Sequence, residues 1–220
     1  MSGIKTVVSS SVGRKLVMAV TGLALFGFVL GHMAGNLQVF QGPEAMNAYG
    51  AFLHEFLHGA GIWFARGGLL AAVALHIWAA VSLTLENFAA RPDGYRRVRH
   101  VESTYASRTM IWSGPILAMF VIYHLLHLTT GQAHSHFVPG DVYRNVVIGF
   151  SSPPVTIAYT VAMLALGLHL YHGIWSMLQT LGLNHPAWNR ARWAFAAGAT
   201  VLIVAGFLSV PFAVIAGVVR

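Results

Sequence analysis

The chain has 220 residues, of which 56% are hydrophobic and only 9% are charged. This composition excludes an ordinary soluble domain, in which about 25% of residues are charged, and indicates an integral membrane protein. The absence of cysteine excludes disulfides and iron–sulphur clusters held by the chain itself. The formal net charge of +7 comes from basic residues between apolar segments, so it reports membrane topology rather than nucleic-acid binding.

Five apolar segments follow in chain order, each close to the roughly 20 residues that cross a bilayer core. They predict helices over about residues 16–40, 65–87, 108–130, 154–182 and 193–218. Pro153 and Pro154 suit the start of the fourth helix, Gly182 suits its end, and Pro211 is expected to kink the fifth. We therefore predict an all-α integral membrane protein in which residues 1–220 form a single five-helix bundle.

The Lys and Arg residues are distributed unevenly about these spans. Three lie at one end of the predicted bundle, namely Arg66, Arg144 and Arg220. The other ten lie at the opposite end: Lys5, Arg14, Lys15, Arg91, Arg96, Arg97, Arg99, Arg108, Arg190 and Arg192. Because cytoplasmic loops are enriched in Lys and Arg, the N-terminus is predicted to be cytoplasmic and the C-terminus to lie outside.

Four histidines lie inside four different apolar segments: His32, His76, His124 and His172. An imidazole at membrane depth is costly and needs a cause, and haem iron, which takes imidazole as an axial ligand, supplies one. A rise of 1.5 Å per residue places His32 and His124 roughly 25 Å from the cytoplasmic edge, and His76 and His172 roughly 15 Å. Two layers of two histidines match two six-coordinate haems, which pass single electrons.

Depth alone leaves the ligands on the third and fourth helices open. His127 and His169 lie one turn from His124 and His172, on nearly the same helix faces. Glycines near the histidines, namely Gly27, Gly31, Gly35 and Gly173, fit either a porphyrin surface or close helix packing. A transporter whose histidines relay protons or bind a metal is the alternative from a different class of protein.

Four stretches together resemble a known family: Gly31–Asn36, Tyr105–Met110, Tyr123–Thr129 and His169–Trp175. With them, nearly the whole chain resembles the five-helix, dihaem cytochrome b membrane-anchor subunit of succinate dehydrogenase and fumarate reductase. The resemblance implies two b haems, a distal one held by His32 and His124 and a proximal one held by His76 and His172. It assigns packing roles to His127 and His169.

The resemblance also implies partners and a reaction. The chain would anchor a flavoprotein with FAD and an iron–sulphur subunit to the bacterial cytoplasmic membrane. It would pass electrons between their clusters and a quinone, expected to be menaquinone, and would not itself bind succinate. The dihaem cytochrome b of a hydrogenase or a formate dehydrogenase is the alternative within the same chemistry.

The quinone site implied by the resemblance lies near the outer haem, where Asn36, Tyr49, His54 and Glu55 are candidates. Quinone reduction consumes protons as well as electrons, so His54 and Glu55 are candidates to exchange them. Residues 54–58 also spell H-E-x-x-H, which binds zinc when both histidines share a helix face. The partner residues of that motif are missing, so zinc is disfavoured. His134 and His136 are expected to face solvent.

Overall fold

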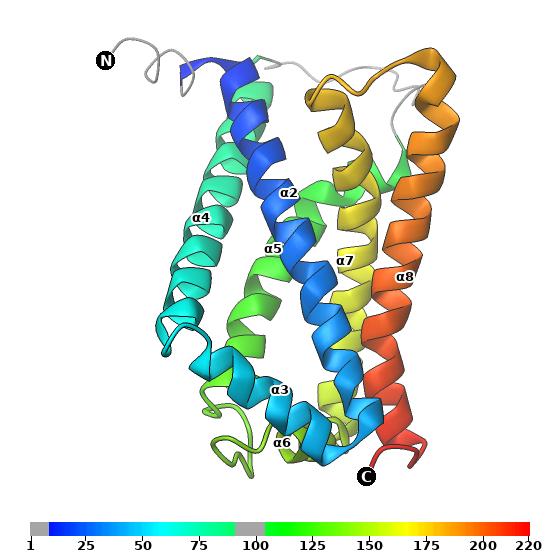
Figure 1. Cartoon of the computed structure of the whole chain (residues 1–220). Helices are drawn as coiled ribbons and strands as arrows, with labels where there is room; N and C mark the ends of the chain where they lie inside the picture. The colour runs from blue at the N-terminus through cyan, green and yellow to red at the C-terminus, as the bar shows by residue number, and fades with distance from the viewer. Residues whose placement is uncertain (1–8, 91–103) are drawn as a thin grey trace.

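The computed structural model describes residues 9–90 and 104–220 as five long helices with short helical segments between them (Figure 1). The long helices are α2 (Ser11–Asn36), α4 (Ala60–Ala89), α5 (Tyr105–His124), α7 (Pro153–Thr180) and α8 (Asn189–Ile215). A π-helical turn, Leu125–Thr129, extends α5. All five are long and apolar enough to cross a membrane, which confirms the predicted five-helix fold class. Lys5, Arg91, Arg96, Arg97 and Arg99, on which the predicted orientation partly rests, lie outside the described residues.

The helix ends follow local capping chemistry. The Ser10 side chain accepts a hydrogen bond from the Gly13 N–H at 3.0 Å, so α2 begins five residues before the predicted start, with the basic residues Arg14 and Lys15 inside it. Thr104 caps α5 in the same way. The Pro153–Pro154 pair begins α7 as predicted, because proline suits the first helical turn.

Helix α7 is the central element of the bundle. It packs against α2, α5 and α8, whereas α4 packs against α2 and α3. A buried apolar cluster between α7 and α8 contains Leu170, Ile174, Ala196 and Ile203. Helix α4 is buried over only a small share of its length, so most of its surface faces away from the rest of the chain.

Short helices cover the end of the bundle opposite the N-terminus (Figure 1). They are the 3-10 helix Leu37–Gln41, α3 (Pro43–Glu55) and α6 (Val142–Phe150). The Asn47 side chain joins α3 to the start of α6, because its Nδ2 donates to Asp141 Oδ1 at 3.1 Å and its Oδ1 accepts from the Tyr143 N–H at 3.0 Å. A second short 3-10 helix, Pro186–Trp188, precedes α8 at the other end.

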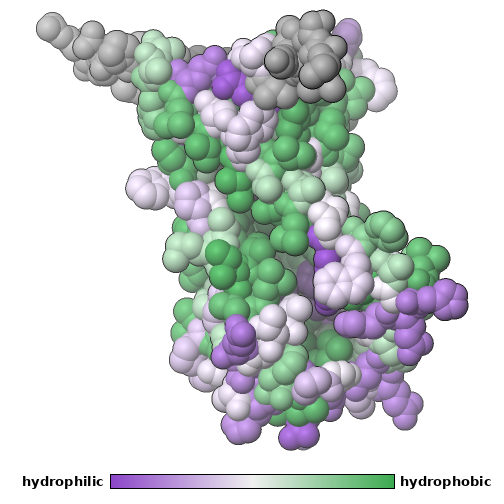
Figure 2. All heavy atoms as spheres, turned by 90° about the vertical axis from the view of Figure 1, so that its left-hand side faces the viewer, coloured by the Kyte–Doolittle hydropathy of each residue, from purple (hydrophilic) through white to green (hydrophobic). Residues whose placement is uncertain are grey.

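The outer surface of the helices is apolar. Figure 2 shows hydrophobic residues over the middle of one face and hydrophilic residues towards both ends. Large side chains such as Phe64, Trp112 and Met119 are among the most exposed in the chain. A surface of this kind suits lipid rather than water.

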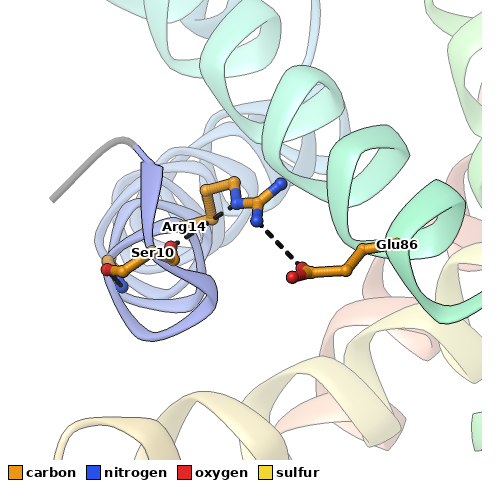
Figure 3. A network of polar contacts seen from close by, with 4 residues as sticks. Ser10, Arg14 and Glu86 are labelled. Atoms are coloured by element: carbon orange, nitrogen blue, oxygen red, sulfur yellow. Dashed lines mark hydrogen bonds and ion pairs between the residues drawn. The ribbon is translucent and has the colours of Figure 1, made fainter. Parts of the chain in front are cut away.

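One ion pair joins α2 and α4 near the N-terminal end of the bundle. Arg14 Nη2 donates to Glu86 Oε2 at 2.9 Å (Figure 3), and Arg14 Nε also donates to the backbone oxygen of Ser10 at 3.4 Å. The pair places the start of α2 beside the end of α4, as two antiparallel neighbouring spans require.

Candidate functional site

The interior histidines meet in two places between helices. In the first, His32 of α2 faces His124 of α5, with ring centroids 5.7 Å apart and ring planes at 80°. Phe28 stacks on His32 with centroids 5.4 Å apart, and Phe207 of α8 lies 5.8 Å from the same ring. The two phenylalanine rings thus pack against the His32 imidazole from α2 itself and from α8.

In the second place, His76 of α4 faces His169 of α7, with ring centroids 6.2 Å apart. The expected partner of His76 was His172, which lies three residues further along α7. Three residues turn an α-helix by about 300°, which is about 60° short of a full turn. The His169 and His172 side chains are therefore about 60° apart around the helix axis and about 4.5 Å apart along it. It is the His169 ring that lies beside His76.

Hydroxyl groups from neighbouring helices bond to the Nδ1 atoms of both inner rings. Thr21 Oγ1 lies 3.2 Å from His76 Nδ1 and itself donates to the Val17 carbonyl at 2.7 Å. Because its only hydrogen is used there, it accepts from His76. Ser113 Oγ makes the same pair of contacts, with His169 Nδ1 at 3.4 Å and the Met110 carbonyl at 3.5 Å. A neutral His76 imidazole therefore carries its hydrogen on Nδ1, which leaves its Nε2 lone pair free.

Tyr159 of α7 bonds to the two histidines at the end of α5. Its hydroxyl lies 3.2 Å from His124 Nδ1 and 3.0 Å from His127 Nδ1. His127 is 1% exposed and is stacked between the rings of Tyr123 and His134. Its Nε2 side faces Gly149, where an added Cβ would lie 3.1 Å from Nε2. The structure therefore gives His127 no open ring nitrogen, whereas His124 faces His32.

His134 is buried, which corrects the prediction that it faces solvent. The loop after α5 turns its ring onto His127, with centroids 4.9 Å apart. Its Nε2 bonds to the Asn145 carbonyl at 2.9 Å, and its Nδ1 accepts from the His136 N–H at 3.2 Å. Both ring nitrogens thus find partners within the chain, which makes burial tolerable. His136 is exposed, as expected.

The residues proposed for quinone binding lie at the end of the bundle that carries α3. Asn36 donates from Nδ2 to the His32 carbonyl at 2.9 Å, and the Tyr49 ring packs against Gly35 so closely that a Cβ there would meet it at 2.7 Å. These two residues lie next to the helix turn that carries His32. His54 and Glu55, by contrast, are exposed at the end of α3, and His54 Nδ1 bonds to the Gly50 carbonyl at 2.8 Å.

The H-E-x-x-H motif does not form a helical zinc site. Helix α3 ends at Glu55, and Leu57 and His58 have positive φ angles of 52° and 54°. His54 and His58 therefore do not lie on successive turns of one helix, which the zinc geometry requires.

Sequence reasoning missed the residues that contact the histidines. Thr21, Ser113 and Tyr159 are ordinary helix residues with no motif around them, and their partners lie 32 to 56 residues away along the chain. It also treated Arg192 only as a mark of topology. Arg192 is 6% exposed, and its Nε and Nη1 have no partner within the described structure, while its guanidinium lies 5.3 Å from the Trp175 ring centroid.

Five helices long and apolar enough to cross a membrane, with two pairs of facing imidazoles between them, define a multi-pass membrane protein. A family model for the succinate dehydrogenase/fumarate reductase transmembrane subunit matches residues 92–207, more than half of the chain, so the chain belongs to this family. It is therefore a membrane subunit that associates with the other subunits of such a complex. Comparison with curated proteins and with solved structures finds no significant match.

Proposed function

We propose that the chain is the membrane anchor and electron-transfer subunit of a succinate:quinone oxidoreductase and that it holds two b haems. His32 and His124 would hold the outer, distal haem, and His76 with His169 the inner, proximal one. The single observation that carries the proposal is the arrangement of four imidazoles from four helices as two facing pairs. The resemblance to the family favours His172 for the inner pair, whereas the ring contact favours His169.

The dimensions of both pairs fit an iron between them. Metal–imidazole bonds of about 2 Å on each side place two axial nitrogens about 4 Å apart, and the ring centres lie further apart than the nitrogens. Centroid separations of 5.7 and 6.2 Å agree with this requirement. A Cβ added to Gly27, Gly31 or Gly173 would meet nothing within 4 Å, so these positions leave helix surface open near the histidines.

When bound, a haem held by two imidazoles would supply single-electron transfer. The chain supplies the orientation and the environment. Thr21 holds the His76 imidazole in the tautomer whose Nε2 can bind a metal, and Ser113 can accept from the same tautomer of His169. Phe28 and Phe207 pack against the His32 ring of the outer pair.

The reaction partners follow from the family and from the composition of the chain. Without cysteine, the chain cannot hold an iron–sulphur cluster, so a separate iron–sulphur subunit and an FAD-containing flavoprotein would deliver or receive the electrons at the cytoplasmic side. We place the N-terminus at that side of a bacterial cytoplasmic membrane on the Lys and Arg distribution. Succinate chemistry belongs to the partners.

The quinone, which we expect to be menaquinone, would bind at the end of the bundle that carries α3, beside the outer haem. Asn36 and Tyr49 adjoin the helix turn of His32. His54 and Glu55 are exposed at the same end, where they can exchange protons with water while a quinone is reduced or a quinol oxidised.

The proposal is tested by haem content. Dithionite-reduced spectra and a pyridine haemochrome assay of the purified complex should show two low-spin b haems per chain. Replacing His32, His76, His124 or His169 individually by leucine should each remove one haem. A wild-type complex without haem would refute the proposal.

Two matched replacements decide the ligand choice. His127→Leu and His172→Leu should both retain two haems, because His127 is enclosed by Tyr123, His134 and Gly149, and because the ring beside His76 is that of His169. Loss of the inner haem in His172→Leu with retention in His169→Leu would move the inner ligand to the position that the family resemblance implies.

A further inference from the structure

Tyr159 joins the outer histidine pair to a buried histidine that no haem is proposed to use. Its side chain is 6% exposed, and its ring is held edge-on by Phe120 and Phe150, with centroids 4.9 and 4.8 Å away and both angles 88°. This clamp directs the hydroxyl to the Nδ1 atoms of His124 and His127.

The hydrogens around Tyr159 can be assigned by counting. A phenol has one hydrogen to donate and can also accept, and each neutral imidazole carries one hydrogen on one of its two nitrogens. The buried phenol hydrogen finds an acceptor among these bonds when one histidine donates to the phenol oxygen and the other accepts the phenol hydrogen. If His124 binds a metal through Nε2, its hydrogen must be on Nδ1, so His124 donates to Tyr159 and Tyr159 donates to His127.

We propose that Tyr159, backed by His127, is a positioning residue for the outer haem: it sets the tautomer and ring orientation of His124 and lowers the midpoint potential of that haem. This inference rests on the proposed function, in particular on His124 as a ligand. A ligand imidazole that donates its other N–H becomes a better electron donor to the metal, which favours the ferric state. Donation by Tyr159 to His127 makes the phenol oxygen a stronger acceptor.

The two proposed haem sites differ in the hydroxyl group that bonds to the ligand histidine. It is Ser113 for His169 of α7 and Tyr159 for His124 of α5. If His169 binds a metal through Nε2, its hydrogen is on Nδ1 and Ser113 Oγ accepts it, while the Ser113 hydroxyl can donate to the Met110 carbonyl in the preceding turn. Tyr159 instead donates its hydrogen to His127. The His127 side chain is buried among Tyr123, His134 and Gly149. Replacements at Ser113 and Tyr159 should therefore act on different haems.

The experiment is a redox titration of the full chain in its complex, with the outer haem identified by its absence in His32→Leu. In Tyr159→Phe, which keeps the ring between Phe120 and Phe150, the outer midpoint potential should rise and the inner one should stay unchanged. The low-spin ferric EPR signal of the outer haem should shift, because the hydrogen bond that fixes the orientation of the His124 ring is lost. His127→Leu should raise the same potential by a smaller amount.

Two control variants separate this effect from a general loss of packing. Tyr123→Phe removes a hydroxyl beside the same His127 ring, but that hydroxyl reaches neither histidine among the described hydrogen bonds, so both potentials should stay. Ser113→Ala should raise only the inner potential.

The inference is overturned if Tyr159→Phe retains both haems with an unshifted outer potential, or if both potentials move equally. If Tyr159→Phe loses the outer haem, its potential cannot be measured, and the His127→Leu complex becomes the test. The outer midpoint potential must rise in that complex, and an unchanged potential rejects the proposal. A wild-type complex that lacks haem would instead refute the proposed function itself.

Discussion

Replacing Gly149 by alanine tests how rigidly the chain encloses His127. The new Cβ would lie 2.8 Å from Cε1 of His127, 3.1 Å from its Nε2 and 3.3 Å from Nε2 of His134. Carbon atoms in contact are separated by about 3.5 Å or more, so the His127 ring would have to move by about 0.7 Å. Tyr123 stacks on that ring with centroids 5.5 Å apart, and the Tyr159 hydroxyl bonds to its Nδ1 at 3.0 Å. These contacts oppose a shift of the His127 ring.

The expected cost combines two effects of opposite sign. Overpacking of a rigid site lowers the free energy of unfolding by about 1–3 kcal/mol. Replacing glycine by alanine inside a helix raises it by about 0.5–1 kcal/mol. Taken at the middle of each range, the net destabilisation is about 1 kcal/mol, which lowers the Tm by roughly 2–4 °C in a chain of this size. Thermal unfolding of the purified protein in one detergent, compared with wild type, measures it.

Two glycine replacements in the same bundle serve as controls. A Cβ at Gly206 would contact the Met33 thioether, a flexible side chain that can move aside, so Gly206→Ala should cost less than Gly149→Ala. A Cβ at Gly27 meets nothing within 4 Å, so Gly27→Ala should leave the Tm unchanged or slightly higher. A Gly149→Ala protein as stable as wild type would show that the His127 pocket is loose and would refute this reasoning.

Three further results are expected. Arg14→Gln and Glu86→Gln should each cost less than about 1 kcal/mol, because an ion pair with one partner largely exposed contributes about 0.2–1 kcal/mol; a double-mutant cycle measures the coupling, and a value well above this range would contradict the estimate. Gly31→Ala should lower the content of the outer haem without changing the stability of the haem-free chain, since its Cβ meets no protein atom within 4 Å; unchanged haem content would show that no porphyrin passes there. His54→Gln should keep both haems and slow quinone turnover by roughly tenfold or more, as expected for a proton-exchanging group; an unchanged rate would remove His54 from the quinone site.

The sequence by itself determined the class of protein. Only segments of about 20 apolar residues cross a bilayer, and their backbone must form helices there, so composition and segment length sufficed to predict five spans that the structure confirms. The interior histidines were equally visible, because a polar ring in an apolar run is conspicuous against its neighbours.

What the tertiary structure decided was which side chains meet. The rotation of α7 about its axis brings His169 rather than His172 beside His76. The side chains of His169 and His172 are only about 60° apart around the helix, so helical periodicity cannot tell which of them faces α4. The burial of His134 and the bridging position of Tyr159 depend on loops and helices that approach from distant parts of the chain. Such contacts are set by packing between helices, whereas the sequence pattern records only the preference of each segment for lipid, water or protein.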